Sequence, residues 1–321
     1  MHSSLSETCY KLRSLLEVAV RRNLSEGILL SGGLDTSILA ALASRYTTLQ
    51  AFTVAFEGAQ APDVKYAQLV ANRFSLKHFA KTFSKDELHA AILMVVKTLK
   101  SFDPMEIRNS VTICMGLKMA KEYGLGAIMT GDGCDELFAG YSFLFDFEKG
   151  QLDLELQKLW EEMQFSSVKL AKALGVETRL PYLDPDLKSF AIKLDSRYKI
   201  RKEKGMKWGK WILRKAFQEI LPEEIVWRVK TPIEQGSGTA MLTTLFNEQI
   251  ADEDFEYKKR KFLEKDLVLI RDKEHLFYYE VYRSVIGVPH PTDLKGKVCP
   301  YCNSNVAEKS TYCRTCGAYP I

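Results

Sequence analysis

The sequence lacks any apolar run long enough to cross a bilayer, and its first residues lack the charged-then-apolar order of a secretory signal. We therefore expect a cytoplasmic protein with no membrane partner. A strong charge imbalance is also missing, because 45 basic and 41 acidic side chains leave a net charge of only +4. This surplus alone does not indicate nucleic-acid binding. With 321 residues, the chain is long enough for two domains, or for one domain with an appendage.

Two common phosphate-binding patterns are absent as well. No Gly-Lys-Ser/Thr stands at Walker A spacing, and there is no Gly-x-Gly-x-x-Gly. Instead, an apolar run from residue 27 breaks at Gly32 and Gly33 and resumes at helical spacing, which predicts a buried strand, a tight turn and a helix. The glycines allow a ligand to approach the backbone closely. The alternative is a turn that only connects a core strand to a core helix.

The same turn is rich in groups that bind anions. Its hydroxyl residues are Ser31, Thr36 and Ser37. Together with the free N–H groups at the start of the helix, these hydroxyls predict a seat for a phosphate. Asp35 lies inside this seat, where a carboxylate is expected if Mg²⁺ joins it to a polyphosphate.

Strand-like and helix-like segments alternate over the first 130 residues. The predicted strands are 28–30, 49–56, 78–82 and 126–130. The predicted helices are 5–24, 36–46, 64–74, 84–99 with a Ser84–Glu87 capping box, and 111–123 after an interruption at 103–109. This alternation predicts an α/β fold with a parallel sheet, and ligands bind such sheets beyond the carboxyl ends of the strands.

The second half is predicted to be mainly helical and to lose the strand alternation. Residues 177–187 contain prolines and predict a loop. Residues 207–217 predict a basic helix in which Lys210 or Arg214 faces polyphosphate. The alternative for this helix is a face that packs in the core while its lysines face solvent. Residues 252–275 predict an exposed charged helical surface, and residues 277–282 predict a core segment.

A second unusual loop follows the fourth predicted strand, at residues 130–141. It contains glycines and three carboxylates: Asp132, Asp135 and Glu136. Three carboxylates at one strand end repel one another unless cations neutralise them, so the loop predicts a metal–nucleotide site. The alternative is an acidic turn that faces solvent.

Four of the seven cysteines stand in the tail as two Cys-x-x-Cys pairs: Cys299, Cys302, Cys313 and Cys316. This spacing predicts a zinc ribbon with four cysteine ligands over residues 296–321, after a main domain over residues 1–290. Disulfides are the alternative, disfavoured in a reducing compartment. Basic residues of the tail suit a docking partner that is either a protein or a tRNA: Lys295, Lys297, Lys309 and Arg314.

Taken together, the loops carry a specific resemblance. Residues 31–37, Ser-Gly-Gly-Leu-Asp-Thr-Ser, resemble the pyrophosphate loop of the N-type ATP pyrophosphatases. Residues 131–141 resemble a loop of the synthetase domain of asparagine synthetases and of relatives such as β-lactam synthetase. Further matches follow at 177–184, 210–217 and 221–230, and the similarity covers roughly residues 8–290. The resemblance implies a Rossmann-like ATP pyrophosphatase fold of the adenine nucleotide alpha hydrolase-like type.

The resemblance also implies a reaction. A carboxylate would attack the α-phosphate of MgATP, release pyrophosphate and form an acyl-adenylate, which ammonia or an amine would then attack, leaving AMP. Asp35 and Asp135 would hold Mg²⁺, Asp132 would lie near the reacting centre, and Lys210 would stabilise charge on the α-phosphate. The residues implied to bind ATP or pyrophosphate are Leu30, Ser31, Gly32, Gly33, Asp35, Thr36, Ser37, Val54 and Gly131. Arg108 and Glu136 are the implied substrate residues.

Three departures from the family pattern shape the expectation. His2 stands where glutamine-dependent members have a cysteine nucleophile, so we expect no glutaminase domain and a nitrogen source that is free ammonia, a separate amidotransferase or an amine. Met105 and Glu106 precede Arg108 where the family has a threonine pair, so aspartate is not predicted as the substrate. The zinc ribbon is shared with some tRNA-thiolating enzymes, and an enzyme that adenylates a nucleobase is therefore the rival hypothesis. A non-catalytic nucleotide sensor is disfavoured, because the implied catalytic carboxylates and lysine are present.

Overall fold

The computed structural model describes residues 4–321, so His2 lies outside the described residues. The chain divides into two compact units. The first unit contains residues 4–53, Pro62–Lys81 and Gly116–Pro232, and the second contains Val54–Ala61, Thr82–Met115 and Ile233–Ile321. The predicted boundary between a domain over 1–290 and a ribbon over 296–321 is a separate expectation and stays a prediction. No helix in residues 4–321 is long and apolar enough to cross a membrane.

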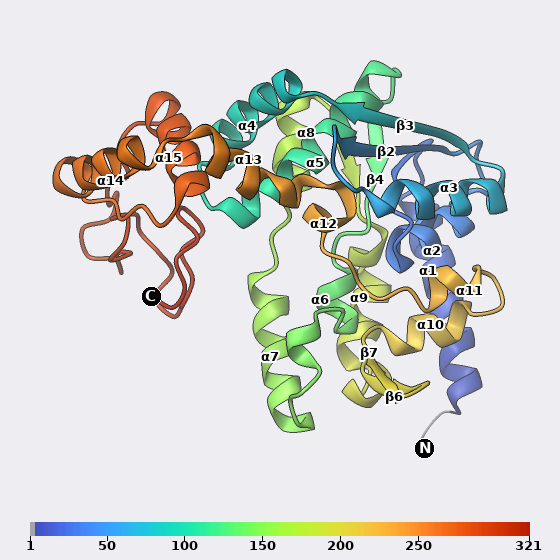
Figure 1. The fold of residues 1–321 in the computed structure, drawn as a ribbon. Coiled ribbons are helices and arrows are strands. Elements are labelled where there is room, and N and C mark those ends of the chain that lie inside the picture. Colours follow the sequence, from blue (N-terminus) through green and yellow to red (C-terminus); the bar gives the residue numbers. More distant parts are fainter. Residues whose placement is uncertain (1–3) are drawn as a thin grey trace. The chain divides into compact units, whose positions relative to one another are not determined.

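A five-stranded sheet has the order β3-β2-β1-β4-β5 (Figure 1). Its strands are β1 Gly27–Leu29, β2 Gln50–Phe56, β3 Lys77–Phe83, β4 Ala127–Met129 and β5 Glu177–Arg179. Strand β1 runs parallel to β2 and β4, so that Ile28 lies opposite Ala51 on one side and Met129 on the other. The strand order reverses at β1 and β4, and in doubly wound sheets ligands bind beyond the carboxyl ends of the strands at this switch point.

Helices of the first unit pack around α1, which begins with a Ser4–Glu7 capping box. The α-helices of the first unit are α1 Leu5–Arg22, α2 Leu34–Ala43, α3 Pro62–Phe74, α6 Cys134–Phe138, α7 Lys149–Glu162, α8 Ser166–Leu174, α9 Pro185–Lys193, α10 Trp211–Phe217 and α11 Glu223–Val226. Three 3₁₀ turns, η1 Ser142–Leu144, η2 Pro181–Leu183 and η3 Ser196–Tyr198, and a hairpin of β6 Arg201–Glu203 and β7 Met206–Trp208 complete the unit. The fully buried Leu12 and Leu16 of α1 share one apolar core with Ile38 of α2 and Ile212 of α10.

The second unit is mainly helical. Its elements are α4 Lys85–Leu99, the first part of α5 Pro104–Glu122, α12 Ile233–Ser237, η4 Thr239–Met241, α13 Leu242–Gln249, α14 Asp252–Asp266 and α15 Lys273–Val285. Helix α15 packs on α4, α13 and α14, and buries Tyr278 and Tyr279 completely. The predicted Ser84–Glu87 capping box of α4 is confirmed.

The predicted α/β class with a parallel sheet is confirmed, and four local predictions are wrong. Residues 103–109 were predicted to separate two helices, but α5 already begins at Pro104. Proline is tolerated there because its missing N–H is not needed at the first helical position. Residues 177–179 form the edge strand β5 instead of a loop. The basic helix begins only at Trp211, after β7. The 252–275 surface is not wholly exposed, since six of its residues are buried: Phe262, Asp266, Val268, Ile270, Glu274 and His275.

Candidate functional site

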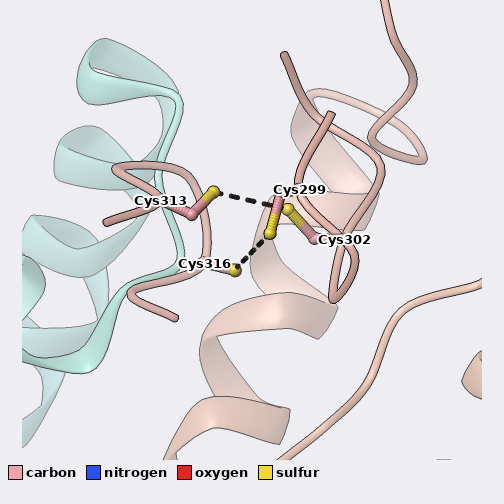
Figure 2. A group of neighbouring side chains, drawn as sticks. All are labelled: Cys299, Cys302, Cys313 and Cys316. Atoms are coloured by element: carbon pink, nitrogen blue, oxygen red, sulfur yellow. Dashed lines mark hydrogen bonds between the residues drawn. The ribbon is translucent and has the colours of Figure 1, made fainter. Parts of the chain in front are cut away.

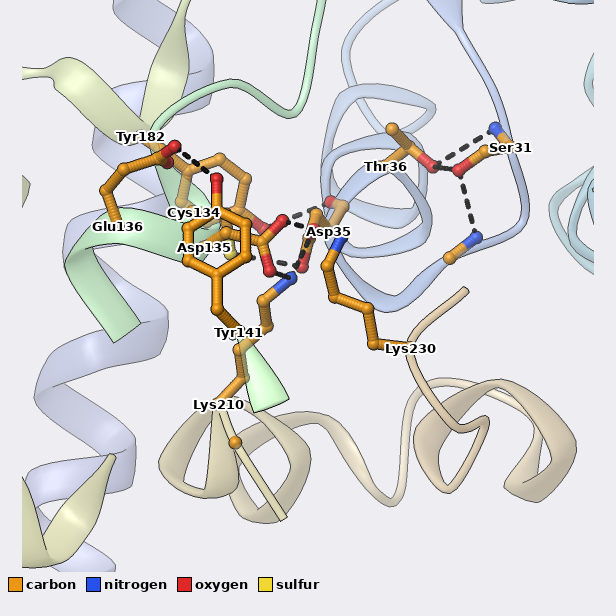
Figure 3. A network of polar contacts seen from close by, with 12 residues as sticks. Ser31, Asp35, Thr36, Cys134, Asp135, Glu136, Tyr141, Tyr182, Lys210 and Lys230 are labelled. Carbon is orange, nitrogen blue, oxygen red and sulfur yellow. Dashed lines mark hydrogen bonds and ion pairs between the residues drawn. The ribbon is translucent and has the colours of Figure 1, made fainter. Parts of the chain in front are cut away.

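The conformation of the loop after β1 depends on a glycine and on two hydrogen bonds. Gly32 has a φ of +66°, and an added Cβ would lie 2.3 Å from the backbone of Tyr66, so glycine is required there. The hydroxyl of Ser31 accepts a hydrogen bond from Gly33 N at 3.2 Å, and the hydroxyl of Thr36 accepts one from Ser31 N at 3.3 Å (Figure 3). These bonds fix the turn that delivers the chain into α2.

The start of α2 fits an anion. Gly33 is the N-cap and has no side chain with which to bond the N–H groups of the first turn. The hydroxyl of Ser37 is buried without a hydrogen-bond partner among the described residues. Backbone donors at a helix start, together with an unpartnered hydroxyl, match the needs of a phosphate group.

The loop after β4 lies directly against the first loop. An added Cβ at Gly131 would be 3.2 Å from Asp35 Cβ and 3.2 Å from Thr36 Cγ2. Thr130 N donates to Arg179 O at 3.1 Å, so the edge strand β5 supports this loop. The two predicted loops therefore meet at the switch point of the sheet.

A charged cluster joins these loops to the segment after the β6–β7 hairpin. Lys210 Nζ lies 2.5 Å from Asp35 Oδ2 and 2.7 Å from Asp135 Oδ1, and Lys230 Nζ lies 3.1 Å from Asp135 Oδ2 (Figure 3). Burial lowers the pKa of Lys210, but the charges of Asp135 and Asp35 outweigh it and raise that pKa above its usual value. Burial opposes ionisation of Asp135, yet the ammonium groups of Lys210 and Lys230 lower its pKa. Lys210 and Asp135 are therefore held in their charged forms, and Asp35 and Lys230 are their further ion-pair partners.

Backbone features bring Lys210 into the cluster. Lys210 is the N-cap of α10 and has a left-handed conformation, with φ 55° and ψ 28°. An added Cβ at Gly140 would lie 1.8 Å from Asp135 Oδ1 and 2.3 Å from Lys210 Cε, so the absence of a side chain there lets the ion pair form. Lys210 N also donates to Phe138 O at 3.0 Å, which ties α10 to the end of α6.

Asp35 and Asp135 are the residues of the cluster that suit Mg²⁺. Both offer carboxylate oxygens, which this cation prefers, and both lie within ion-pair distance of one lysine nitrogen. Cys134 lies beside them and donates to Asp35 Oδ1 at 3.1 Å. Burial and the neighbouring Asp35 raise the pKa of Cys134 well above its usual value, so it is a thiol.

The other two carboxylates of the second loop are hydrogen-bonded to hydroxyl groups. Asp132 accepts hydrogen bonds from the hydroxyls of Thr130 and Ser167, and burial raises its pKa. Glu136 accepts from the Tyr141 hydroxyl at 2.6 Å, and burial raises its pKa too. Hydroxyl groups therefore bind two of the three carboxylates of this loop, and the metal–nucleotide site predicted there stays a prediction.

Two cationic residues near the loops were not singled out from the sequence. Lys230 pairs with Asp135, as described above, and Arg228 donates to Ser31 O at 3.1 Å and pairs with Asp63 at 2.5 Å. The guanidinium of Arg228 also lies 4.0 Å from the centre of the Tyr66 ring. Both residues lie at the end of residues 221–230, a segment that resembles the family. This resemblance is the sequence feature from which they could have been identified.

Arg214 does not face the cluster. It is buried and donates to the backbone carbonyls of Gly209, Val226 and Arg228. Of the two predicted alternatives for this helix, Lys210 lies in the cluster and Arg214 anchors the chain that leads to Lys230.

Three remaining predicted residues lie outside the cluster. Leu30 is buried, and its carbonyl accepts from the Thr53 hydroxyl at 2.6 Å. Val54 is buried in β2. In the second unit, Arg108 pairs with Glu274 at 2.7 Å, with the two side chains 17% and 3% exposed.

The tail cysteines form a second candidate site. The sulfurs of Cys299, Cys302, Cys313 and Cys316 lie within 4.8 Å of one another, and all four residues are buried (Figure 2). Cys299 and Cys316 have an Sγ–Sγ distance of 3.8 Å, and Cys302 and Cys313 have one of 3.7 Å. A tetrahedron with Zn–S bonds of about 2.3 Å has edges of about 3.8 Å, so the four thiols fit a metal ion.

Comparison with known proteins places this geometry in context. The sequence model of the family described as asparagine synthase matches residues 11–157 and 151–275. The glutamine-hydrolyzing asparagine synthetase B of Escherichia coli (strain K12) is 29% identical over 309 residues, covering 87% of this chain and 54% of that protein. The glutamine-hydrolyzing asparagine synthetase of Sandersonia aurantiaca is 32% identical over 258 residues, covering 73% and 49%. The chain thus spans about half the length of the curated relatives it matches.

Among solved structures, the NMN synthetase from Francisella tularensis is similar, with a TM-score of 0.40 and 13% identity, over 88% of this chain and 94% of that one.

Proposed function

The chain belongs to the asparagine synthase family, and from this premise we propose that it is an ATP-dependent, AMP-forming ligase that joins a carboxylate to ammonia or an amine. The observation that carries the proposal is the contact of Lys210 with both Asp35 and Asp135. This contact lies near the start of α2, whose free N–H groups suit a phosphate. A nucleotide polyphosphate needs such a combination of backbone donors, cation ligands and a fixed ammonium group.

In the proposed reaction, the hydroxyls of Ser31, Thr36 and Ser37 and the first N–H groups of α2 bind the β- and γ-phosphates. Asp35 and Asp135 would hold Mg²⁺, which would supply charge neutralisation. Lys210, released from those carboxylates, stabilises the negative charge that grows as a substrate oxygen attacks the α-phosphorus and the bond to pyrophosphate breaks. The nitrogen nucleophile then attacks the acyl carbon, and AMP leaves.

The nitrogen source and the carboxylate are part of the proposal. We propose a small-molecule carboxylate as the substrate, with free ammonia, an amine or a separate amidotransferase as the source of nitrogen. For the tail thiols we propose Zn²⁺ in a structural role, because a closed four-ligand site leaves no position for a substrate.

The rival is an enzyme that adenylates a tRNA base for sulfur transfer, and the group of four tail cysteines is the observation that favours it. Sulfur transfer needs a reactive thiolate, whereas the cysteine in the charged cluster, Cys134, is buried and has a raised pKa. This favours the ligase.

The deciding experiment is ATP–pyrophosphate exchange, measured with amino acids, other small carboxylates and bulk tRNA. The ligase predicts exchange that a carboxylate stimulates, with AMP as the nucleotide product. Exchange that depends on tRNA and ignores every carboxylate would support the rival, and release of ADP with orthophosphate would exclude both.

A further inference from the structure

The four-cysteine module, residues 296–321, consists of two halves: the first bonds to the segment before α15, and the second bonds to the start of α5 and also to Arg271 at the end of that segment. The first half contains Cys299 and Cys302, and the second contains Cys313 and Cys316. No disulfide joins the halves, since all four cysteines are free. Among the described residues, they are also the one group of three or more potential metal-ligating side chains.

The second half bonds to the start of α5. Phe102 N donates to Thr315 O at 2.7 Å, and the Ser101 hydroxyl donates to Arg314 O at 2.7 Å. The Tyr312 hydroxyl donates to the Asp103 carboxylate, which also accepts from Met105 N at 3.1 Å and so caps α5. An added Cβ at Gly317 would lie 2.2 Å from Asp103 Oδ1, so the backbone packs directly on this carboxylate.

The first half bonds to the segment before α15. Leu269 N donates to Tyr301 O at 2.8 Å. At the end of the same segment, Arg271 donates to Gly317 O at 2.7 Å and to Cys316 O at 2.8 Å, both in the second half. Asp272 follows as the N-cap of α15 and accepts from His275 N at 2.8 Å.

An ion pair lies close to both attachment points. Arg108 of α5 and Glu274 of α15 are 2.7 Å apart, and the Glu274 carboxylate also accepts from the hydroxyls of Thr243 and Tyr278. Arg108 follows Asp103 by about one helical turn, and Glu274 lies within the first turn of α15. The starts of the two helices therefore set the position of Arg108.

We propose that the four cysteines bind one Zn²⁺, and that this ion joins the two halves of the module into a brace between the starts of α5 and α15, which positions Arg108. The Sγ–Sγ distances of 3.8 and 3.7 Å match a tetrahedral zinc–thiolate centre. A segment of this size cannot bury a core of its own, so the ion supplies the energy that holds the halves together.

The test compares four variants of the full chain by zinc content and by hydrogen exchange. Wild type should contain about one equivalent of zinc. Cys302→Ser should lose it and exchange about tenfold faster or more in peptides from both α5 and α15. Tyr312→Phe should keep zinc and accelerate exchange in α5 alone, whereas Arg271→Met should keep zinc and accelerate exchange in α15 alone. Cys9→Ser, at a buried cysteine of the first unit, is the matched control and should change neither.

Unchanged exchange in α5 and α15 after loss of the metal would overturn the brace, and wild-type protein without zinc would overturn the metal site. Neither readout requires turnover, so both remain decisive if the ligase proposal fails.

Discussion

Lys210 and Lys199 are two buried lysines of the same unit with opposite electrostatic surroundings. Lys210 lies between Asp35 and Asp135, and its pKa is raised because the two carboxylates outweigh the effect of burial. Lys199 is fully buried, and its ammonium group has no hydrogen-bond partner among the described residues. It lies 4.4 Å from the centre of the Trp160 ring, and burial lowers its pKa to about 7.

The difference shows that burial does not determine the charge of a lysine; its partners do. A carboxylate at ion-pair distance favours the ammonium form, whereas the weaker attraction of an aromatic face does not replace the lost hydration. Lys210 therefore keeps its charge across the whole physiological pH range, and Lys199 titrates near neutrality. The first can serve phosphate chemistry, and the second costs stability when it is protonated.

Removing the paired ammonium group should have the largest effect. Lys210→Ala should lower the rate of ATP–pyrophosphate exchange by about 10²–10³-fold or more, because it removes charge directed at the transition state. The matched control is Lys207→Ala, since Lys207 is half exposed and pairs with Asp146 at the surface. A loss of less than about tenfold in Lys210→Ala would contradict a role in the chemical step.

Removing one of the two carboxylates should have the next largest effect. Asp135→Asn leaves Lys230 without its carboxylate and Lys210 with only Asp35, so the free energy of unfolding should fall by about 3–5 kcal/mol in urea titrations. Asp146→Asn is the control, because that side chain is 89% exposed in its ion pair and should change stability by less than about 0.5 kcal/mol. Equal effects of the two substitutions would show that the cluster is as solvated as the surface pair.

Much of this cluster was predictable from the sequence. The glycine turn, the acidic loop and Lys210 each carry a local pattern, and the alternation of strands and helices predicts that loops after β1 and β4 share one end of the sheet. The proximity of Asp35 and Asp135 follows from these two facts, whereas Lys210 was expected near the phosphates from its basic segment and from the family resemblance. Their roles in catalysis stay predictions.

The rest depends on long-range packing that no local pattern encodes. Asp132 bonds to Ser167, which is distant in sequence, so its direction could not be deduced from the acidic loop. Strand β5 is short and polar, and it forms because β4 offers an edge. The burial of Lys199 results from packing against Trp160, whereas a lysine in a short polar segment reads as exposed.

The pH dependence of stability gives the smallest and most selective prediction. With a folded pKa of about 7 for Lys199 and an unfolded pKa of about 10.4, the unfolded chain binds more protons between these values. The free energy of unfolding therefore gains at most about 1.4 kcal/mol per pH unit from Lys199 as pH rises through this window, and below pH of about 7 the cost is constant.

Lys199→Met should remove this contribution. The variant should exceed wild type in stability at pH 6, and its advantage should shrink by about 1–3 kcal/mol at pH 9, as measured by urea unfolding. Lys193→Met, at an exposed position of α9, is the control, and its difference from wild type should be the same at both pH values. An advantage for Lys199→Met that does not change with pH would show that Lys199 stays protonated in the folded chain up to pH 9, because the folded and unfolded chains would then bind the same number of protons.

The left-handed backbone at Lys210 has a consequence for protein engineering. A non-glycine residue in this conformation costs roughly 1 kcal/mol, and glycine would relieve that cost. Loss of the ammonium group would leave Asp35 and Asp135 as neighbouring unpaired carboxylates, at a cost of about 3–5 kcal/mol that exceeds this relief, so selection for thermal stability would retain the strained lysine. A library designed around this chain should keep position 210 fixed and seek its stabilising substitutions elsewhere.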